Sequence, residues 1–542
     1  MKRSLLLLFF SLTLTLSFAQ KTDEPKRPKL VVGLVVDQMR WDFLYRYSDR
    51  YKANGGFSRL LNQGFSNENT FIPYTPTITA CGHACVYTGS VPAIHGITGN
   101  TWYERDLGRI VYCTEDKMVK TVGTAGTAGE MSPKNMLTTT IGDELRLASN
   151  FGSKVIGIAI KDRGAILPAG HSANGAYWYN SSSGNWISST YYGDTLPSWV
   201  SAFNSKKVVD KYYQQGWNTL YPINTYVNST SDEQDYEGKP FAGAKGFPYD
   251  LKPMTGKNYG AISTTPYGNT MTLQLAREAI AGEGLGKGKF TDMLTVSLSS
   301  PDYIGHTFGP NSIEAEDAYL RLDQDLGEFL DYLDKQVGKG QYLLFLSADH
   351  GVAHVPAFLN SNKIPAGVFD GSKLSTGLNS ILEKQFGSAK LVLGSFNYQV
   401  HLNHPLIDSL KLDKAKIIDQ VISYLLTIPE ITRAFSLEGL SAATLPATQK
   451  EMLAKGFFPK RSGDVQYILL PQYFEGGTTG TTHGMWNPYD AHIPLVWYGW
   501  MIRPGKSNQE VYMSDIAPTI AALLRIQMPS GSIGKPIERI TR

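Results

Sequence analysis

The sequence lacks an excess of charge of either sign. Its 542 residues include 51 Lys and Arg and 48 Asp and Glu, which gives a formal net charge of +3. Without Lys2 and Arg3, which precede the first apolar run, 49 basic side chains stand against 48 acidic ones. A balanced chain has no net field that attracts polyanions. We therefore expect neither nucleic acid nor an anionic membrane surface as a partner.

Cysteine is also scarce. The three cysteines, Cys81, Cys85 and Cys113, are too few for a disulfide framework even in an oxidising compartment. At most one pair can form, and the sequence does not say which. Their small number excludes the class of small secreted domains that disulfides hold together.

Beyond the N-terminus, no apolar run is long enough to span a bilayer. The first run, Leu5–Leu16, follows Lys2 and Arg3 and is shorter than the roughly 20 residues of a spanning helix. It ends in small residues at Ala19, a pattern typical of a secretory signal peptide rather than of a membrane anchor. We expect residues 1–19 to be cleaved near Ala19, leaving a periplasmic or secreted protein without a membrane anchor.

The sequence does contain enough apolar residues for a large core. Hydrophobic residues make up 42% of the chain and charged residues 18%, consistent with one large domain with insertions or with two domains. Residues 170–270, rich in Tyr, Trp, Ser, Asn and Gly, and residues 355–475 differ from their surroundings. We interpret both, with approximate boundaries, as insertions in one domain over 20–542, and we expect a monomer.

Short apolar, β-branched runs alternate with helical or glycine-rich stretches along the chain. This alternation predicts an α/β fold with a mostly parallel central sheet covered by helices on both faces. One covering helix is expected after Ser312, where acidic residues precede leucines at helical spacing. Three of the strand-like runs are followed by carboxylates: 29–36 by Asp37, 293–298 by Asp302 and 342–346 by Asp349.

Because ligands bind outside the carboxyl ends of the strands in such sheets, these acids are expected to converge on one crevice. Crowded carboxylates repel each other and are costly to desolvate unless a cation offsets their charge. Mixed carboxylate and imidazole ligands suit zinc, and six of them suit two ions with open positions. The candidate ligands are Asp37, Asp302, His306, Asp349, His350 and His483.

The remaining histidines, His83, His95, His171, His354, His401, His404 and His492, lack a matching acid in a strand-end context. We interpret them as structural, because histidine has many roles besides metal ligation.

A hydroxyl nucleophile is predicted at Thr79, in the stretch Pro76-Thr-Ile-Thr79-Ala-Cys-Gly-His. A helix of small residues over 80–87 would begin there, and its N-terminus would direct N–H groups at an anion. Metal coordination would make the hydroxyl reactive at mild pH. Two alternatives stay open: Thr79 is only an N-cap, or Cys81 or Cys85 is the reactive group.

These residues resemble the motifs of the alkaline phosphatase superfamily, most closely its PafA-type branch, over essentially the whole mature chain. The resemblance implies hydrolysis of phosphate monoesters of broad specificity through a phosphothreonine on Thr79 at a two-zinc site. It implies one zinc on Asp302, His306 and His483, and a second on Asp37, Asp349 and His350 beside Thr79. It also implies that Asn100, Lys161 and Arg163 bind the non-bridging phosphate oxygens.

The implied phosphate ligands fit a monoester, whose dianion carries one more negative charge than a diester. A lysine and a forked arginine supply compensating charge and bidentate hydrogen bonds. Lys161 and Arg163 therefore argue against the main alternative, a phosphodiesterase or nucleotide pyrophosphatase of the same superfamily. A sulfatase would need a Cys- or Ser-x-Pro-x-Arg motif, which residues 81–85 do not provide. A manganese phosphomutase and a non-catalytic metal-binding protein are weaker alternatives.

Overall fold

The computed structural model describes residues 26–541 except residue 242. The predicted signal peptide, residues 1–19, lies outside the described residues. Within the described part, no helix combines the length and the apolar character needed to cross a membrane.

An eleven-stranded sheet forms the centre of the molecule, in the order β17-β2-β18-β10-β1-β9-β6-β7-β8-β5, with β19 beside β2. Its five middle strands run parallel. They are β10 (Tyr342–Ser347), β1 (Leu30–Val36), β9 (Asp292–Leu298), β6 (Val155–Ala159) and β7 (Gly175–Asn180). The others are β18 (Leu495–Gly499), β2 (Phe65–Phe71), β17 (His492–Ile493), β19 (Gly505–Tyr512), β8 (Asn185–Ser189) and β5 (Thr121–Val122).

The middle strands are buried along their whole length, which explains their continuous apolar sequences. Every residue of β1, β9 and β10 is buried, because helices cover both faces of a parallel sheet. The predicted α/β fold is confirmed. The sheet is parallel in its middle, while β18 and β8 join it antiparallel toward its two edges.

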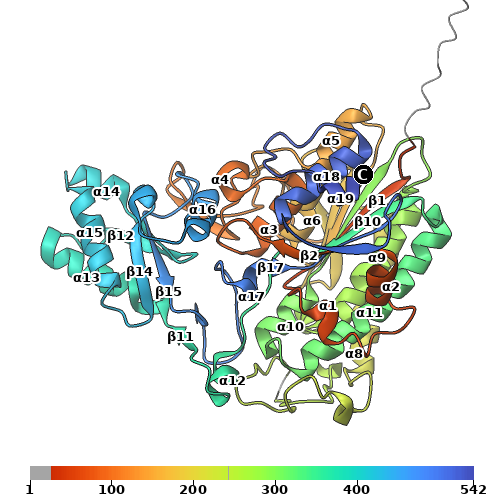
Figure 1. Cartoon of the computed structure of the whole chain (residues 1–542), viewed down its shortest axis with the longest axis horizontal. Helices are drawn as coiled ribbons and strands as arrows, with labels where there is room; N and C mark the ends of the chain where they lie inside the picture. The colour runs from red at the N-terminus through yellow and green to blue at the C-terminus, as the bar shows by residue number, and fades with distance from the viewer. Residues whose placement is uncertain (1–25, 242, 542) are drawn as a thin grey trace, which may run out of the picture.

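Helices cover the sheet on both sides (Figure 1). One layer contains α2 (Gly56–Gln63), α9 (Tyr267–Glu283) and α11 (Ile313–Leu333), and the other contains α3 (Thr79–Thr88), α5 (Ile141–Ala148), α6 (Asp162–Ala169) and α18 (Ile516–Leu524). The predicted helix after Ser312 is α11. The Ser312 hydroxyl accepts a hydrogen bond of 3.1 Å from the Ala315 amide, so that the cap is also confirmed.

A separate lobe lies beside the main sheet, drawn in cyan and blue in Figure 1. Its four-stranded sheet has the order β12-β13-β15-β14, and it has its own hydrophobic cluster. The strands are β12 (Val392–Phe396), β13 (Gln399–Leu402), β14 (Ile431–Ser436) and β15 (Val465–Leu469), and the helices are α13 (Leu374–Phe386), α14 (His404–Ser409), α15 (Lys414–Leu425) and α16 (Ala447–Gly456). A small parallel pair, β11 (Gly367–Phe369) with β16 (Tyr473–Glu475), completes this part.

Residues 170–270 do not form a comparable lobe around a sheet of their own. They include β7 and β8 of the main sheet, followed by α7 (Ser198–Ser205) and α8 (Val208–Gln215). The division of residues 20–542 into one domain with two insertions stays a prediction.

A two-stranded hairpin of β3 (Thr101–Glu104) and β4 (Arg109–Tyr112) connects the two parts of the molecule. The Arg461 guanidinium, which comes from the lobe segment, forms an ion pair of 2.9 Å with Glu104 and donates to the Asn135 carbonyl oxygen at 2.8 Å. Arg105 forms a second ion pair, 3.0 Å long, with Asp464. Both ion pairs fix the tip half of the hairpin to the lobe.

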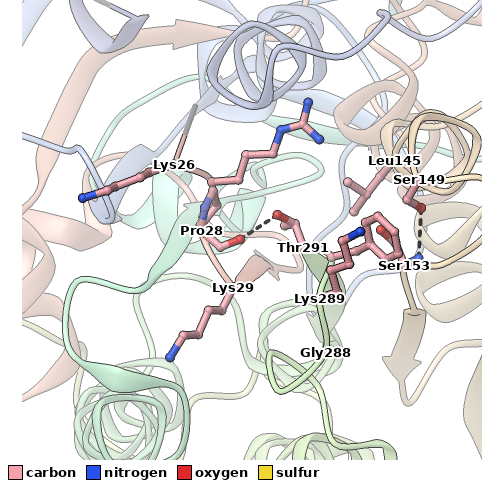
Figure 2. A pocket seen from close by; sticks show the side chains of 11 residues that line it. Lys26, Pro28, Lys29, Leu145, Ser149, Ser153, Gly288, Lys289 and Thr291 are labelled. Atoms are coloured by element: carbon pink, nitrogen blue, oxygen red, sulfur yellow. Dashed lines mark hydrogen bonds between the residues drawn. The ribbon is translucent and has the colours of Figure 1, made fainter. Parts of the chain in front are cut away.

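At the amino ends of β1, β6 and β9 lies a cavity of about 490 Å³ (Figure 2). Four exposed cationic residues line it, Lys26, Arg27, Lys29 and Lys289. In Figure 2, Lys26 and Lys29 point in different directions, and both point away from Lys289. The charges at this end of the sheet therefore do not converge on one point.

Candidate active site

The three predicted carboxylates meet at the carboxyl ends of three adjacent parallel strands. Strand pairing aligns Val36 of β1 with Leu298 of β9, and Val35 with Ser347 of β10. Asp37 directly follows β1, and Asp349 follows β10. Asp302 lies in the first turn of α10 (Ser300–Phe308), which begins just after β9. All three carboxylates are buried.

One group of possible metal ligands contains Asp302, His306 and His483, as the sequence predicts. The His306 Nε2 atom lies 3.1 Å from the Asp302 Oδ1 atom, and the His483 Nε2 atom lies 3.7 Å from the same oxygen. Asp302 and His306 are four residues apart on α10, so that they share one face of the helix. His483 comes from the loop that follows the lobe, 177 residues further along the chain than His306.

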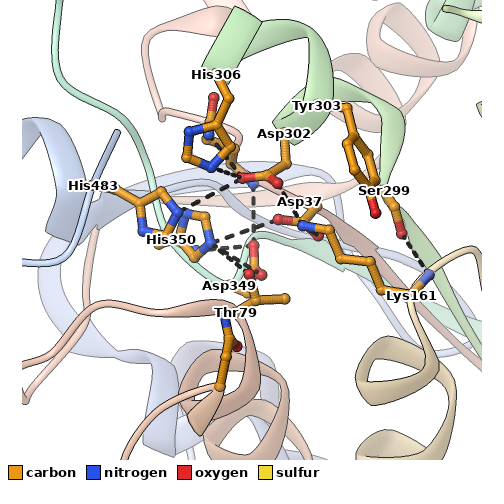
Figure 3. A network of polar contacts seen from close by, with 12 residues as sticks. Asp37, Thr79, Lys161, Ser299, Asp302, Tyr303, His306, Asp349, His350 and His483 are labelled. Atoms are coloured by element: carbon orange, nitrogen blue, oxygen red, sulfur yellow. Dashed lines mark hydrogen bonds and ion pairs between the residues drawn. The ribbon is translucent and has the colours of Figure 1, made fainter. Parts of the chain in front are cut away.

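A second group contains Asp37, Asp302 and His350. The predicted set had Asp349 in the place of Asp302. Asp349 is nevertheless close, because its Oδ2 atom lies 3.4 Å from the His350 Nε2 atom, which in turn lies 3.6 Å from Asp37 Oδ1. Figure 3 shows the side chains of both groups facing one another.

The three histidines of the site are held in the same tautomer. The Nδ1 atoms of His306, His350 and His483 lie 2.8, 3.0 and 2.7 Å from backbone carbonyl oxygens of Thr481, Gly351 and Thr77. A carbonyl oxygen only accepts, so each neutral ring donates through Nδ1 and keeps a lone pair on Nε2. A backbone contact of this kind is what orients a metal-ligating histidine. Each Nε2 faces a carboxylate.

The buried carboxylates leave oxygens available to bind a cation. Within the described residues, the buried Asp37 Oδ1 and Asp349 Oδ2 atoms have no hydrogen-bond partner. Burial and the nearby Asp349 raise the pKa of Asp37 well above its usual value. Burial also acts on Asp302, but His306 and Lys161 outweigh it and hold the pKa of Asp302 well below its usual value. Carboxylate and imidazole ligands of this kind, with oxygens that lack a hydrogen-bond partner, fit divalent metal.

Lys161 supplies a positive charge to this group. Its Nζ atom lies 2.7 Å from Asp37 Oδ2 and 2.5 Å from Asp302 Oδ2, and the side chain is almost completely buried. Its ammonium group also lies 5.2 Å from the centre of the Tyr303 ring. Lys161 therefore bridges the two groups of possible metal ligands.

Thr79 is the first residue of α3, and its hydroxyl oxygen lies 3.2 Å from the His350 Nε2 atom. The residue is 2% exposed. The N-cap of α3 is Ile78 rather than Thr79, and the N-cap residue makes no side-chain capping hydrogen bond. The alternative that Thr79 is only an N-cap is therefore wrong, and its hydroxyl faces the metal-ligand groups.

The cysteine alternative is disfavoured by burial. All three cysteines are unpaired and buried, and burial raises the pKa of Cys81 and of Cys85 well above the usual value. The Cys81 thiol donates to the Ile97 carbonyl oxygen at 3.2 Å. A thiol that stays protonated is a poor nucleophile.

The three predicted phosphate ligands come from two segments beside Thr79. Asn100 precedes β3, and its Oδ1 atom accepts a hydrogen bond of 3.1 Å from the Ala80 amide in α3. Lys161 is the N-cap of α6, and Arg163 is the second residue of that helix. Since α6 follows β6, which neighbours β9 in the sheet, Lys161 and Arg163 lie at the same edge as the three carboxylates.

Two residues that sequence reasoning missed also contact the site. The Gln38 side-chain amide donates to Asp302 Oδ1 at 2.8 Å, and its backbone amide donates to Asp349 Oδ1 at 3.1 Å. His83, interpreted as structural, lies 3.3 Å from Asp349 Oδ2 and 2.8 Å from the Ser297 hydroxyl. Its position four residues after Thr79 on one helix was the available signal.

Comparison with known proteins places this geometry in a family. Residues 31–485, which include every candidate ligand from Asp37 to His483, match the family described as type I phosphodiesterase / nucleotide pyrophosphatase. Alkaline phosphatase PhoV of Synechococcus elongatus is 55% identical over 94% of this chain and 92% of that protein. Alkaline phosphatase PafA of Elizabethkingia meningoseptica is 49% identical over 96% of both chains. The chain belongs to the PafA-type alkaline phosphatase family.

The present chain has the same fold as a crystal structure of wild-type alkaline phosphatase PafA. It is similar with a TM-score of 0.93 and 48% identity, covering 95% of this chain and 99% of that chain. Another relative, 53% identical over 96% of both proteins, is named a calcium-transporting ATPase of Myroides odoratus.

Proposed function

We propose that this protein is an alkaline phosphatase that hydrolyses phosphate monoesters of broad specificity through Thr79 at a two-zinc site. The observation that carries the proposal is the position of the Thr79 hydroxyl, 3.2 Å from His350 Nε2 and beside two groups of carboxylate and imidazole ligands. The names of the PhoV and PafA relatives support the same activity.

The residues of the site fit zinc in number and in kind. One ion would be held by Asp302, His306 and His483, and the other by Asp37, Asp349 and His350. Zinc, when bound, supplies Lewis-acid charge that offsets the carboxylates and stabilises the oxygens of the transferring phosphoryl group.

Thr79 carries the covalent step of the proposed reaction. Its hydroxyl oxygen attacks phosphorus and loses its proton, the bond from phosphorus to the leaving-group oxygen breaks, and Thr79 becomes phosphorylated. The leaving group departs as an alcohol, which takes up one proton in place of the one that Thr79 loses. Water then hydrolyses the phosphothreonine and releases inorganic phosphate. Because Thr79 begins α3, the positive end of the helix dipole favours the negative charge that develops on the phosphoryl oxygens.

Asn100, Lys161 and Arg163 bind the phosphoryl group in this proposal. The Asn100 Oδ1 atom accepts a hydrogen bond from the Ala80 amide, so the N–H groups of the Asn100 side chain remain for the substrate. The positive charges of Lys161 and Arg163 match a dianionic monoester. Broad specificity follows, since all three residues contact the phosphate that every monoester shares. ATP belongs in a substrate panel because of the name of the Myroides relative.

The second candidate function is hydrolysis of phosphodiesters or nucleotide pyrophosphates. It is favoured by the description of the family whose model matches residues 31–485. Lys161 and Arg163 favour the monoester instead, because a diester group has only one negative charge to offset.

We further propose that the protein is exported and acts as a monomer in the periplasm or outside the cell. Export rests on the pattern of Lys2, Arg3 and the apolar run that ends near Ala19.

Trapping the intermediate tests the proposed function. The enzyme is mixed with excess p-nitrophenyl phosphate, quenched in acid and digested, and the peptides are analysed by mass spectrometry. We expect phosphate on Thr79 in the wild type, and neither label nor turnover in Thr79→Ala, whose zinc content should stay normal. Label on another residue, or substantial turnover by Thr79→Ala, would falsify the assignment.

A further inference from the structure

The two ends of the β3–β4 hairpin bring Asn100 and Tyr112 together. Asn100 directly precedes β3, and Tyr112 is the last residue of β4, paired with Thr101. The Cys113 amide donates to the Asn100 carbonyl oxygen at 2.9 Å and closes this end of the hairpin. The end of the hairpin that faces the site therefore holds one proposed phosphate ligand, Asn100, beside a tyrosine.

The Tyr112 hydroxyl joins the two residues that follow Lys161. It lies 2.7 Å from Asp162 Oδ1 and 3.0 Å from Arg163 Nη1. An ionised carboxylate only accepts and a guanidinium only donates, so the hydroxyl donates to Asp162 and accepts from Arg163. Burial and Asp162 raise the pKa of Tyr112 well above its usual value, and the hydroxyl keeps its proton. One hydroxyl thus orients both side chains.

Asp162 has a second hydrogen bond on its other oxygen. The Thr114 hydroxyl donates to Asp162 Oδ2 at 2.6 Å, so both carboxylate oxygens are bound by the hairpin and the residues after it. The carboxylate is adjacent in sequence to Arg163, but the contacts that its two oxygens make are with the Tyr112 and Thr114 hydroxyls. The Tyr112 hydroxyl therefore lies between the carboxylate and the guanidinium and contacts both.

Arg163 keeps donors free as a result. Its buried Nε atom has no hydrogen-bond partner among the described residues, and its contact with Tyr112 uses Nη1 alone. A guanidinium has five N–H donors in a fixed fork, so fixing one end of the fork with the phenol determines where the others point.

We propose that Tyr112 is a positioning residue for monoester recognition. Its hydroxyl directs Arg163 at the phosphoryl oxygens of the substrate and, together with Thr114, engages the Asp162 oxygens so that they do not take up the guanidinium donors. The inference rests on the proposed function, in which Arg163 binds the phosphoryl group. It also gives the hairpin a role, because one structural unit then aligns Asn100 and Arg163 on the same phosphate.

The design of the test uses the anchoring of the hairpin. Arg461 and Arg105 tie its tip half to the lobe through Glu104 and Asp464, so that removing one hydroxyl leaves the hairpin in place. The variant Tyr112→Phe keeps the ring and loses only the hydroxyl. Tyr103→Phe, in the paired strand of the same hairpin, is the matched control. Thr114→Val weakens the hold on Asp162 without touching Arg163.

The measurement is kcat/KM for p-nitrophenyl phosphate and for bis(p-nitrophenyl) phosphate, with zinc present. We expect Tyr112→Phe to lower monoester kcat/KM about tenfold, as for loss of a hydrogen bond to a charged group, and to leave the diester value unchanged. Thr114→Val should cause a smaller loss of the same kind, and Tyr103→Phe none. In the Arg163→Ala background, Tyr112→Phe should have no further effect, because it acts through Arg163.

Three outcomes would overturn the inference: wild-type values for Tyr112→Phe, equal losses for both substrates, or a loss of the same size with and without Arg163. The last two would assign the hydroxyl a purely structural role. If Arg163→Ala alone leaves monoester kcat/KM unchanged, the proposed role of Arg163 fails first. The double-variant cycle thus separates the two failures.

Discussion

The two ends of the parallel strands carry opposite charges in opposite surroundings. At the carboxyl ends, Asp37, Asp302 and Asp349 are buried and face one another across two groups of possible metal ligands. At the amino ends, Lys26 and Lys29 are exposed and point apart around a cavity of about 490 Å³ (Figure 2). Both ends carry several charged side chains, but only at the carboxyl ends do these side chains converge on one place.

The difference shows what distinguishes a site from a hollow. Burial of like charges is costly, and a fold keeps it where a ligand offsets the cost. Exposed lysines cost nothing, because water solvates each one separately. The volume of a cavity is therefore a weaker guide to function than the convergence of buried groups whose oxygens lack a hydrogen-bond partner, such as Asp37 Oδ1 and Asp349 Oδ2.

Removal of metal from the carboxyl-end site should have the largest effect on activity and stability. After treatment with a chelator and buffer exchange, we expect turnover of p-nitrophenyl phosphate to fall at least about 100-fold, since electrostatic stabilisation of this kind dominates such reactions. The melting temperature should fall as well, because the carboxylates lose their offsetting charge and native-state binding is lost. Added Zn²⁺ should restore both.

Activity assays and calorimetry on the same chelated sample check this prediction. Full turnover and an unchanged melting temperature after complete removal of metal would contradict it. If Mg²⁺ or Ca²⁺ but not Zn²⁺ restores activity, the site binds metal as predicted but the assignment of zinc is wrong.

The smallest effect is expected at the amino ends. The double variant Lys29→Ala/Lys289→Ala should keep kcat/KM for p-nitrophenyl phosphate within about twofold and shift the free energy of unfolding by no more than about 0.5 kcal/mol, as is usual for exposed positions. Steady-state kinetics and urea unfolding measure the two quantities. A tenfold loss of activity would show that this end takes part in the reaction.

Much of the fold was predictable because its signals are local. The apolar runs before Asp37, Asp302 and Asp349 correspond to β1, β9 and β10, and the cap at Ser312 begins α11. Strand-end acids could be assigned to one edge because parallel strands put their carboxyl ends together. The same argument placed the three acids and the adjacent His350 at one edge without knowing the strand order, whereas the division of the ligands over two ions came from the resemblance to the family.

The rest depends on contacts between distant residues. Tyr112 meets Asp162 50 residues away, and Arg461 meets Glu104 357 residues away. Nothing in the sequence near Tyr112 indicates that it contacts Asp162, and nothing near Arg461 indicates that it contacts Glu104. The position of Lys161 between Asp37 and Asp302 was likewise not predictable, because it depends on how three strands are ordered in the sheet.

The most direct test of monoester hydrolysis at the acidic edge compares p-nitrophenyl phosphate with bis(p-nitrophenyl) phosphate, for the wild type and for Lys161→Ala/Arg163→Ala, with and without added zinc. We expect a zinc-dependent preference of the wild type for the monoester, reduced at least about 100-fold in the variant, which loses two charged donors to the phosphate. A preference for the diester that the substitutions leave unchanged would contradict this function and favour a phosphodiesterase.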